Sequence, residues 1–598
     1  MEVPRLDHAA FGNGRVIGLV SPTSAIEWLC LPRFDSASIF GRLLDQDRGG
    51  TFRILVRGLE VTGRMAYLPN TNVVSTRFED GDWAWEVIDF APRLPRGLTV
   101  EVPIETVRLV RPLRGQPVLS VDFDPRPDYG RRPRDLVLGT DGIEVRGASG
   151  LLHLFSSLPA AYLLNGTEFV LSRPAFFVLR YGALGEPPTW AEVDRDLEIT
   201  VAGWRAWAKT CALPSFAGRE VLRSALCLKL HAYHDTGAII AAATTSVPEA
   251  MGTPRTWDYR YCWLRDAAFV VEALRRLSHL NEGEQFLRYL RDVVEAGELQ
   301  PLYGIGGERE LKEELLPHLA GFGGNGPVRV GNAASQQLQN DLMGEMVLSL
   351  ATLLTDPRIV YDGDDDYFAL ITKLVERAIK MAPEPDTGIW EFRSILKPYT
   401  FSRAMCWVAI DRGARLARAM GHDDLAARWE AEAARERAIV LDRGYNAELG
   451  FFTQSLDGTQ PDAANLLLPM VGLVDAKDPR FVSTMVAYRR LLIEDGLVLR
   501  YRNPDDFGQT TSAFTICSFW FAEALALMGQ LDEAIAMFNH VLTFANPVGL
   551  FSEDIDPKTG QLLGNFPQAY THVGLIHAAT TIGELIDARD GSGFPWRG

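Results

Sequence analysis

Hydrophobic and polar positions follow two different patterns along this chain. Up to about residue 188, short runs rich in Val, Ile, Phe and Trp are bounded by Gly, Pro, Asn or Asp, as is typical of antiparallel strands joined by turns. No helical stripe of useful length separates these runs, so the first part is predicted to be an antiparallel β-sandwich. The predicted strands lie at 16–20, 25–31, 73–78, 83–90, 104–110, 118–123, 169–172 and 176–181.

From about residue 190 the apolar spacing becomes that of helices. Residues 194–209 predict a linking helix, and Leu222, Leu226 and Leu230, four apart, open a longer helical series. Because no tandem motif recurs, a solenoid is disfavoured, and helix hairpins closing into a double-layered α/α barrel are expected. The other predicted helices lie at 266–277, 284–296, 336–354, 367–381, 402–420, 423–441, 512–528, 531–544 and 570–586.

These two patterns predict three parts: a β-sandwich at 1–188, a linker helix region at 189–215 and a barrel at 216–598. A barrel of this kind exposes the loops at one end as a site. The helical part contains long aromatic-rich loops that suit this position, at 255–263, 299–334, 383–400 and 545–569.

Charge limits the classes of partner. Lys and Arg total 60 against 77 Asp and Glu, which gives a net charge of −17. An acidic surface repels phosphate backbones and anionic lipid, so neither nucleic acid nor a membrane is expected as the main partner. A neutral small molecule such as a sugar is compatible with this charge, and a homo-oligomer stays open.

Cysteine usage and the N-terminus indicate a compartment. The 6 cysteines are scattered and form no CxxC pair, which favours buried free thiols in a reducing environment. The first residues lack the apolar core of a signal peptide, and no apolar run of about 18 residues exists to cross a membrane. The sequence therefore predicts a cytoplasmic protein.

No metal or cofactor is predicted. The acidic run at 362–366 resembles the start of a calcium loop, but Tyr367 stands where glycine is required and Lys373 where glutamate is required. His231 and His234 lack a third ligand nearby. The glycines of 302–308 (LYGIGGE) and 321–331 match no phosphate-binding motif, and we interpret them as a close-fitting loop near the site or an ordinary surface loop.

Three loop segments carry candidate chemistry. Residues 256–266 (TWDYRYCWLRD) combine aromatic faces, suited to pyranose rings, with the Arg265–Asp266 pair, which can bind sugar hydroxyls. Asp266 could instead be a helix N-cap. Glu391 stands between Trp390 and Phe392, and Glu553 follows an apolar run; either glutamate alone could also be an ordinary exposed loop residue.

Taken together, the motifs closely resemble glycoside hydrolase family 15, which includes glucoamylases and trehalases. The resemblance covers almost the whole chain and rests on the order and spacing of several segments. These segments are IGLV at 17–20, IEWLCLPRFDS at 26–36, YCWLRD at 261–266, LYGIGGE at 302–308, GIWE at 388–391 and GNFPQAY at 564–570.

The resemblance implies an N-terminal antiparallel β-sandwich, a linker helix and an (α/α)6 barrel. It implies that Glu391 is the general acid and Glu553 the general base. It also implies substrate-binding roles for further residues of the pocket: Tyr259, Trp263, Arg265, Asp266, Trp390 and Arg500.

The resemblance, with these acid and base roles, implies an inverting hydrolysis of an α-glucoside. One protonates the glycosidic oxygen while the other activates water on the opposite face of the sugar, so β-glucose is released. The apolar neighbours of Glu391 predict a raised pKa that keeps it protonated, and a wetter setting is expected to keep Glu553 ionised.

Trehalose is the substrate we expect, because the chain is predicted to be cytosolic and no starch-binding module is recognised. Glucoamylase-type α-1,4-glucosidase activity and isomaltose or other α-1,6-glucosidase activity are the alternatives within the class. A sugar phosphorylase on an α/α barrel, a non-catalytic sugar-binding protein and a helical scaffold are alternatives from other classes.

Overall fold

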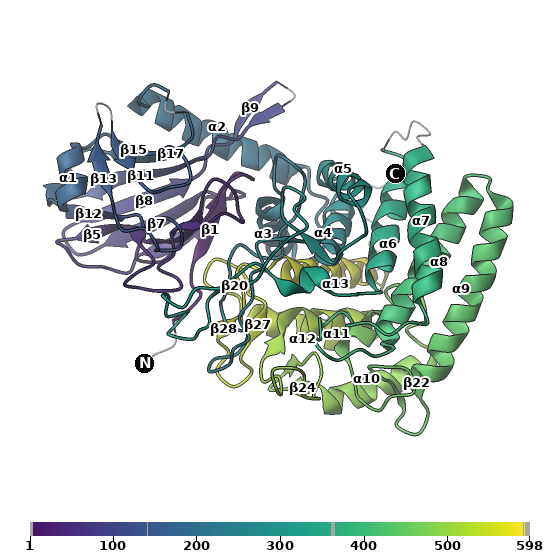
Figure 1. Ribbon diagram of the computed structural model, residues 1–598. Coiled ribbons are helices and arrows are strands. Elements are labelled where there is room, and N and C mark those ends of the chain that lie inside the picture. Colours follow the sequence, from purple (N-terminus) through teal and green to yellow (C-terminus); the bar gives the residue numbers. More distant parts are fainter. Residues whose placement is uncertain are drawn as a thin grey trace.

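The computed structural model describes residues 4–97, 99–139, 142–183, 185–359, 365–589 and 591. The strands gather on one side of the molecule and most helices on the other (Figure 1). Helix α2 (Trp190–Lys209) follows the last long strand and precedes the helical part. Residues 362–364, part of the acidic run that resembles a calcium loop, lie outside the described residues.

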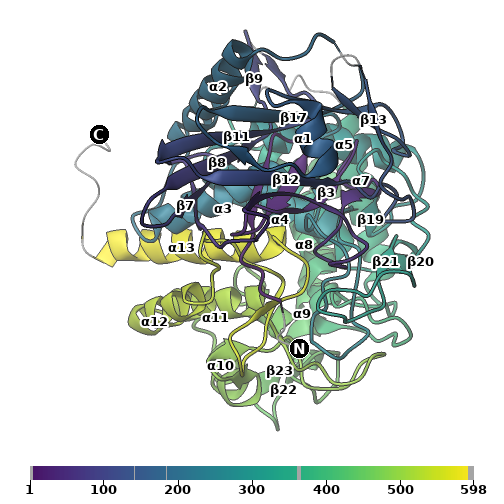
Figure 2. The same cartoon turned by 90° about the vertical axis from the view of Figure 1, so that its left-hand side faces the viewer.

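Two antiparallel sheets form the N-terminal part (Figure 2). The first has the order β1-β2-β3-β5-β12-β16, with β4 paired to β3, and the second has the order β13-β14-β15-β17-β11-β8-β7-β6. The strands of the first are β1 (Ala9–Gly12), β2 (Ile17–Val20), β3 (Ile26–Cys30), β4 (Ser38–Phe40), β5 (Thr51–Val56), β12 (Val118–Asp124) and β16 (Phe169–Val170). Those of the second are β6 (Arg64–Tyr67), β7 (Val74–Glu79), β8 (Ala84–Phe90), β11 (Glu105–Arg114), β13 (Leu136–Leu138), β14 (Ile143–Val145), β15 (Leu152–Ser156) and β17 (Ala175–Tyr181).

Aromatic side chains join the two sheets. Phe52 on β5 packs edge-on against Phe123 in its own sheet and against Phe177 in the other, with ring centroids 5.1 and 5.6 Å apart. A buried ion pair, Arg108–Asp89 at 2.7 Å, lies in the same core. A short helix, α1 (Ala160–Asn165), and a hairpin of β9 (Leu94–Arg96) and β10 (Thr99–Glu101) complete this part.

The helical part is a double ring. Five helices and one 3₁₀ element, η2, contact each other in sequence and close the inner ring, since α13 returns to α4. The members of the inner ring are α4 (Leu264–Arg276), α6 (Leu342–Leu354), α8 (Thr400–Ala419), η2 (Ala463–Leu467), α11 (Thr515–Leu527) and α13 (Ala569–Arg589). The outer elements are α3 (Gly218–His231), α5 (Asn281–Glu295), α7 (Asp365–Met381), α9 (Asp423–Arg443), α10 (Pro479–Leu491) and α12 (Leu531–Leu542).

The predicted β-sandwich and (α/α)6 barrel are confirmed, but some helices and strands were predicted with wrong bounds or missed. The helix predicted at 336–354 begins only at Leu342, because residues 333–336 form a separate 3₁₀ turn, η1 (Ala333–Gln336). The fourth inner position is the short η2, which has no helical stripe to recognise. Helix α10 was also missed, as were strands such as β1, β5 and β6.

The order of elements supports a division into parts. β17 ends at Tyr181, α2 ends at Lys209 and α3 begins at Gly218. We propose on this basis a sandwich at 1–188, a linker region at 189–215 and a barrel at 216–598. In the part of the chain that the structure describes, no helix has both the length and the apolar character needed to span a membrane.

Candidate active site

A cavity opens among the loops at the end of the barrel where the inner helices begin. Trp263, Arg265 and Asp266 reach it from the start of α4, Phe514 from the residue before α11, and Tyr570 from the start of α13. All of the site residues predicted from the sequence line it: Tyr259, Trp263, Arg265, Asp266, Trp390, Glu391, Arg500 and Glu553. The barrel therefore brings together carboxylates that are far apart in the sequence.

Glu391 is held through one of its carboxylate oxygens. Oε1 accepts hydrogen bonds from Trp263 Nε1 at 2.7 Å, Gln339 Nε2 at 3.2 Å and Arg265 Nη2 at 3.3 Å. None of these bonds reaches Oε2. The side chain is 20% exposed toward the cavity.

The turn that presents Glu391 has an unusual backbone. Glu391 adopts a φ of 60°, which costs a non-glycine residue free energy and persists only where the surroundings enforce it. Trp390 Nε1 donates to Asp462 Oδ1 at 2.8 Å, next to η2. The preceding Gly388 also has a positive φ, and a Cβ there would lie 2.9 Å from the Tyr399 ring. The Trp390 anchor and this close packing fix the turn.

Glu553 occupies a different environment. Tyr259 Oη donates to its Oε1 at 2.7 Å, while no described residue donates to its Oε2. The rings of Tyr259 and Trp263 meet edge-to-face with centroids 5.1 Å apart. Each glutamate is therefore hydrogen-bonded to one member of a single aromatic pair, which places both carboxylates in one pocket.

The expected surroundings of the two glutamates are wrong. Glu553 is only 1% exposed, whereas Glu391 faces N–H donors and the cavity. Burial, together with the nearby carboxyls of Glu249 and Asp554, raises the pKa of Glu553 well above its usual value. Burial likewise raises the pKa of Asp554 to about 7, although Arg500 opposes the shift. The residues next to Glu553 in the sequence could not reveal that it is buried, because the segments that cover it are distant in the sequence.

Arg500 lines the pocket from a fixed position. Its guanidinium is hydrogen-bonded to Glu249 and lies 3.6 Å from Asp554 Oδ1. Glu249 also accepts a hydrogen bond from Trp257 Nε1 at 2.7 Å. The arginine offsets part of the negative charge that this side of the cavity accumulates.

Asp266 is not a helix cap. The N-cap position of α4 is Trp263, and Asp266 lies inside the first turn without a capping hydrogen bond. It is buried beside Arg265, with Nε and Oδ1 3.5 Å apart, and Oδ1 accepts no hydrogen bond from the described residues. Burial raises the pKa of Asp266 to about 6. A buried acceptor that lines a cavity and lacks a partner is suited to a ligand hydroxyl.

Several pocket residues were missed by the sequence analysis. Glu249 and Gln339 stand in segments without a recognisable motif, so only the folded structure reveals their contacts. Others in the cavity wall, Trp257, Arg393 and Phe507, sit in aromatic or charged loops that gave a weak signal. Among the residues that the structure describes, no group of three His, Cys, Asp or Glu side chains is arranged to hold a metal ion.

Paired carboxylates, an arginine–aspartate pair and aromatic walls at the mouth of an α/α barrel define a glycoside hydrolase site. Residues 216–580 match the model of the glycosyl hydrolases family 15, and residues 2–160 match the trehalase-like N-terminal domain. The chain belongs to glycosyl hydrolases family 15.

Relatives match over nearly the full length. A trehalase of Mycolicibacterium smegmatis is 35% identical over 99% of this chain and 93% of its own length. A trehalase of Thermoplasma volcanium is 32% identical over 97% of this chain and 93% of its own. A bacterial glucoamylase crystallised with acarbose shares the fold, with a TM-score of 0.70 at 13% identity over 98% of this chain and 96% of its own.

The two glutamates are tested by amide substitution. Glu391→Gln and Glu553→Gln should each lower kcat by about 10²–10⁴-fold, the usual contribution of a general acid or base. Circular dichroism should stay unchanged, and Glu376→Gln on α7, outside the cavity wall, serves as the control. Near-wild-type turnover of either variant would remove that residue from its assigned role.

Asp266→Ala separates binding from stability. Loss of a charged hydrogen-bond partner worth about 1.5–3 kcal/mol should lower kcat/KM by about 10–150-fold, with both kcat and KM affected. Because Arg265 keeps Gln339 and Glu391 as partners when the Asp266 carboxylate is removed, the melting temperature should change little. A lower melting temperature with intact kinetics would show a purely structural role.

Proposed function

We propose that this chain hydrolyses α,α-trehalose to glucose with inversion at the attacked carbon. The observation that carries the proposal is the pair Glu391 and Glu553, each hydrogen-bonded to one ring of the Tyr259–Trp263 pair in one cavity. The full-length relatives named trehalase support this substrate.

In the proposed reaction, Glu391 Oε2 gives its proton to the glycosidic oxygen as the bond from that oxygen to the anomeric carbon breaks. Glu553 takes a proton from water, whose oxygen bonds to the same carbon from the opposite face. Arg265 and Asp266 hold the hydroxyls of the attacked glucose. Tyr259 and Arg500 favour the ionised form of Glu553, which must lose its proton to act as the base.

A set of contacts that we call the mouth clasp closes one side of the cavity. It consists of Trp257, Glu313, Arg329, Arg393 and Phe507. Glu313 pairs with Arg329 at 2.7 Å and with Arg393 at 2.8 Å. The guanidinium of Arg393 lies 4.6 Å from the Trp257 ring centroid and 5.5 Å from that of Phe507.

The clasp joins loops from four parts of the barrel, including the long loop at 301–332. That loop is also tied to the sandwich, because Arg33 pairs with Glu308 at 2.7 Å and Arg48 Nη1 donates to His318 O at 2.8 Å. A cavity bounded in this way favours a disaccharide over a polymer. We propose a cytoplasmic location with a small α-glucoside as the only required partner.

The substrate is tested with a panel followed by proton NMR. Trehalose should give a higher kcat/KM than maltose, isomaltose or maltoheptaose, and early spectra should show equal α- and β-glucose, one from each half of the disaccharide. Release of α-glucose alone would indicate retention and overturn both glutamate roles. Fastest hydrolysis of maltoheptaose would make the enzyme a glucoamylase, and of isomaltose an α-1,6-glucosidase.

The clasp is tested by Arg393→Ala. Because the substitution removes an ion pair and two ring contacts, kcat/KM for trehalose should fall about three- to tenfold, or about 0.7–1.4 kcal/mol, while the maltoheptaose-to-trehalose ratio rises. Arg418→Ala is the matched control, since Arg418 on α8 likewise forms ion pairs, with Asp423 and Glu430, but is not part of the cavity wall. An unchanged substrate ratio would show that the clasp does not select for size.

A further inference from the structure

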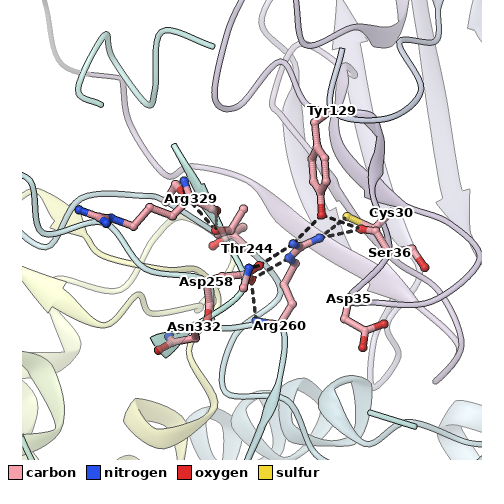
Figure 3. A network of polar contacts seen from close by, with 12 residues as sticks. Cys30, Asp35, Ser36, Tyr129, Thr244, Asp258, Arg260, Arg329 and Asn332 are labelled. Carbon is pink, nitrogen blue, oxygen red and sulfur yellow. Dashed lines mark hydrogen bonds and ion pairs between the residues drawn. The ribbon is translucent and has the colours of Figure 1, made fainter. Parts of the chain in front are cut away.

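Arg260 lies in the sequence between Tyr259 and Trp263, which line the pocket, but its own side chain is not part of the pocket wall. Tyr259, the preceding residue, lines the cavity and donates to Glu553. Arg260 is 0% exposed and extends toward the β-sandwich (Figure 3). The segment at 257–263 therefore does two things. It lines the pocket with aromatic side chains, and it places the Arg260 guanidinium at the junction between the β-sandwich and the barrel.

The guanidinium of Arg260 is fully engaged. It forms two hydrogen bonds with Asp258, at 2.9 and 2.6 Å, within its own loop. It donates to the backbone oxygen of Ser36 at 2.7 Å and to Tyr129 Oη at 2.8 Å, and Nη1 lies 3.4 Å from Cys30 Sγ. Three of these partners, Cys30, Ser36 and Tyr129, belong to the sandwich (Figure 3).

Asp258 extends the network to a second wall of the cavity. One of its carboxylate oxygens accepts from the backbone N–H of Gly331 at 3.2 Å. Its backbone oxygen accepts from Asn332 Nδ2, also at 3.2 Å, and Asn332 lines the cavity. The same ion pair thus fixes the segment at 257–263 and the end of the loop at 301–332.

A buried ion pair is sensitive to the loss of any partner. Burying charge is costly unless every hydrogen bond is made, and such a pair contributes more to one specific arrangement than to net stability. Removal of a sandwich partner leaves a donor of Arg260 unsatisfied. The adjacent backbone must then shift, and Tyr259 is attached to it.

We propose that the β-sandwich positions the catalytic base: Tyr129, Ser36 and Cys30 hold Arg260, and Arg260 holds Tyr259 against Glu553. Tyr129 is then a positioning residue for a reaction that takes place in the barrel. The inference rests on the proposed role of Glu553. A displacement of about 1 Å at a reacting group can cost about 10²-fold in rate, so a distant hydroxyl can influence turnover through this path.

The test is a double-mutant cycle of Tyr129→Phe and Tyr259→Phe. Tyr129→Phe should lower kcat about 3- to 30-fold and change KM less than twofold, because the base rather than the bound sugar is displaced. In the Tyr259→Phe background the same substitution should have almost no further effect on kcat. Multiplicative effects, or a lower melting temperature with unchanged kcat, would overturn the proposal.

Tyr67→Phe is the matched control. Tyr67 is also a sandwich tyrosine at the junction with the barrel: its hydroxyl bonds to the backbone of Ala10, and Arg223 of α3 lies over its ring. It is not part of the cavity wall. This variant should keep wild-type kcat even where its stability falls, and a loss of kcat equal to that of Tyr129→Phe would make the effect nonspecific.

Two features of the experiment distinguish a failure of this proposal from a failure of the proposed function. Rates are measured with whichever α-glucoside the wild-type chain hydrolyses fastest, so a wrong substrate does not affect the cycle. Hydrogen exchange of the peptide covering 257–263 needs no substrate, and it should be faster in Tyr129→Phe than in Tyr67→Phe. Equal exchange in the two variants would contradict the hold of the sandwich on Tyr259, whereas full activity of Glu553→Gln would remove the role of the base and leave that hold standing.

Discussion

The buried ion pair between Arg260 and Asp258 is the interaction on which the pocket depends most. Both residues lie in the segment that carries Tyr259 and Trp263, and neither is exposed to solvent. One ion pair therefore stabilises the conformation of the segment from within. The side chains of Trp257, Tyr259 and Trp263 in the same segment line the cavity. Because a charge pair of this kind tolerates few geometries, the aromatic residues beside it are held in one position.

A second constraint is the concentration of negative charge. Glu249, Glu553 and Asp554 lie close together in a buried region, and Arg500 provides the nearest opposite charge. The inner helices α4, α11 and α13 begin at the cavity, so their positive N-terminal ends also face these carboxyls. Burial still raises the pKa of Glu553, which leaves the ionised form dependent on Arg500 and on the hydroxyl of Tyr259.

The sequence predicted the architecture, and which residues line one cavity, better than the environment of each group. Strands β7 and β8 were recognised from their β-branched and aromatic runs, and the long helices from apolar positions four apart. The missed inner element η2 is short and owes its place to the ring around it. Glu249 has no motif, and the burial of Glu553 comes from segments hundreds of residues away, so periodicity and local composition could reveal neither.

The hydrogen bonds of Glu391 and Glu553 differ in a way that supports the different roles we propose for them. The Oε1 of Glu391 accepts hydrogen bonds from Trp263, Gln339 and Arg265, so in the role that we propose for Glu391 the transferred proton would reside on Oε2. The positive φ of Glu391 and the anchor from Trp390 to Asp462 set the direction of that oxygen before substrate binds. Glu553 lacks such a cluster of donors: among the described residues only the Tyr259 hydroxyl donates to it, and its Oε2 is buried without a donor. The roles that we propose for the two glutamates thus rest on the number of donors around each carboxylate, and the proposed hold of the sandwich on Tyr259 would act on the one donor of Glu553.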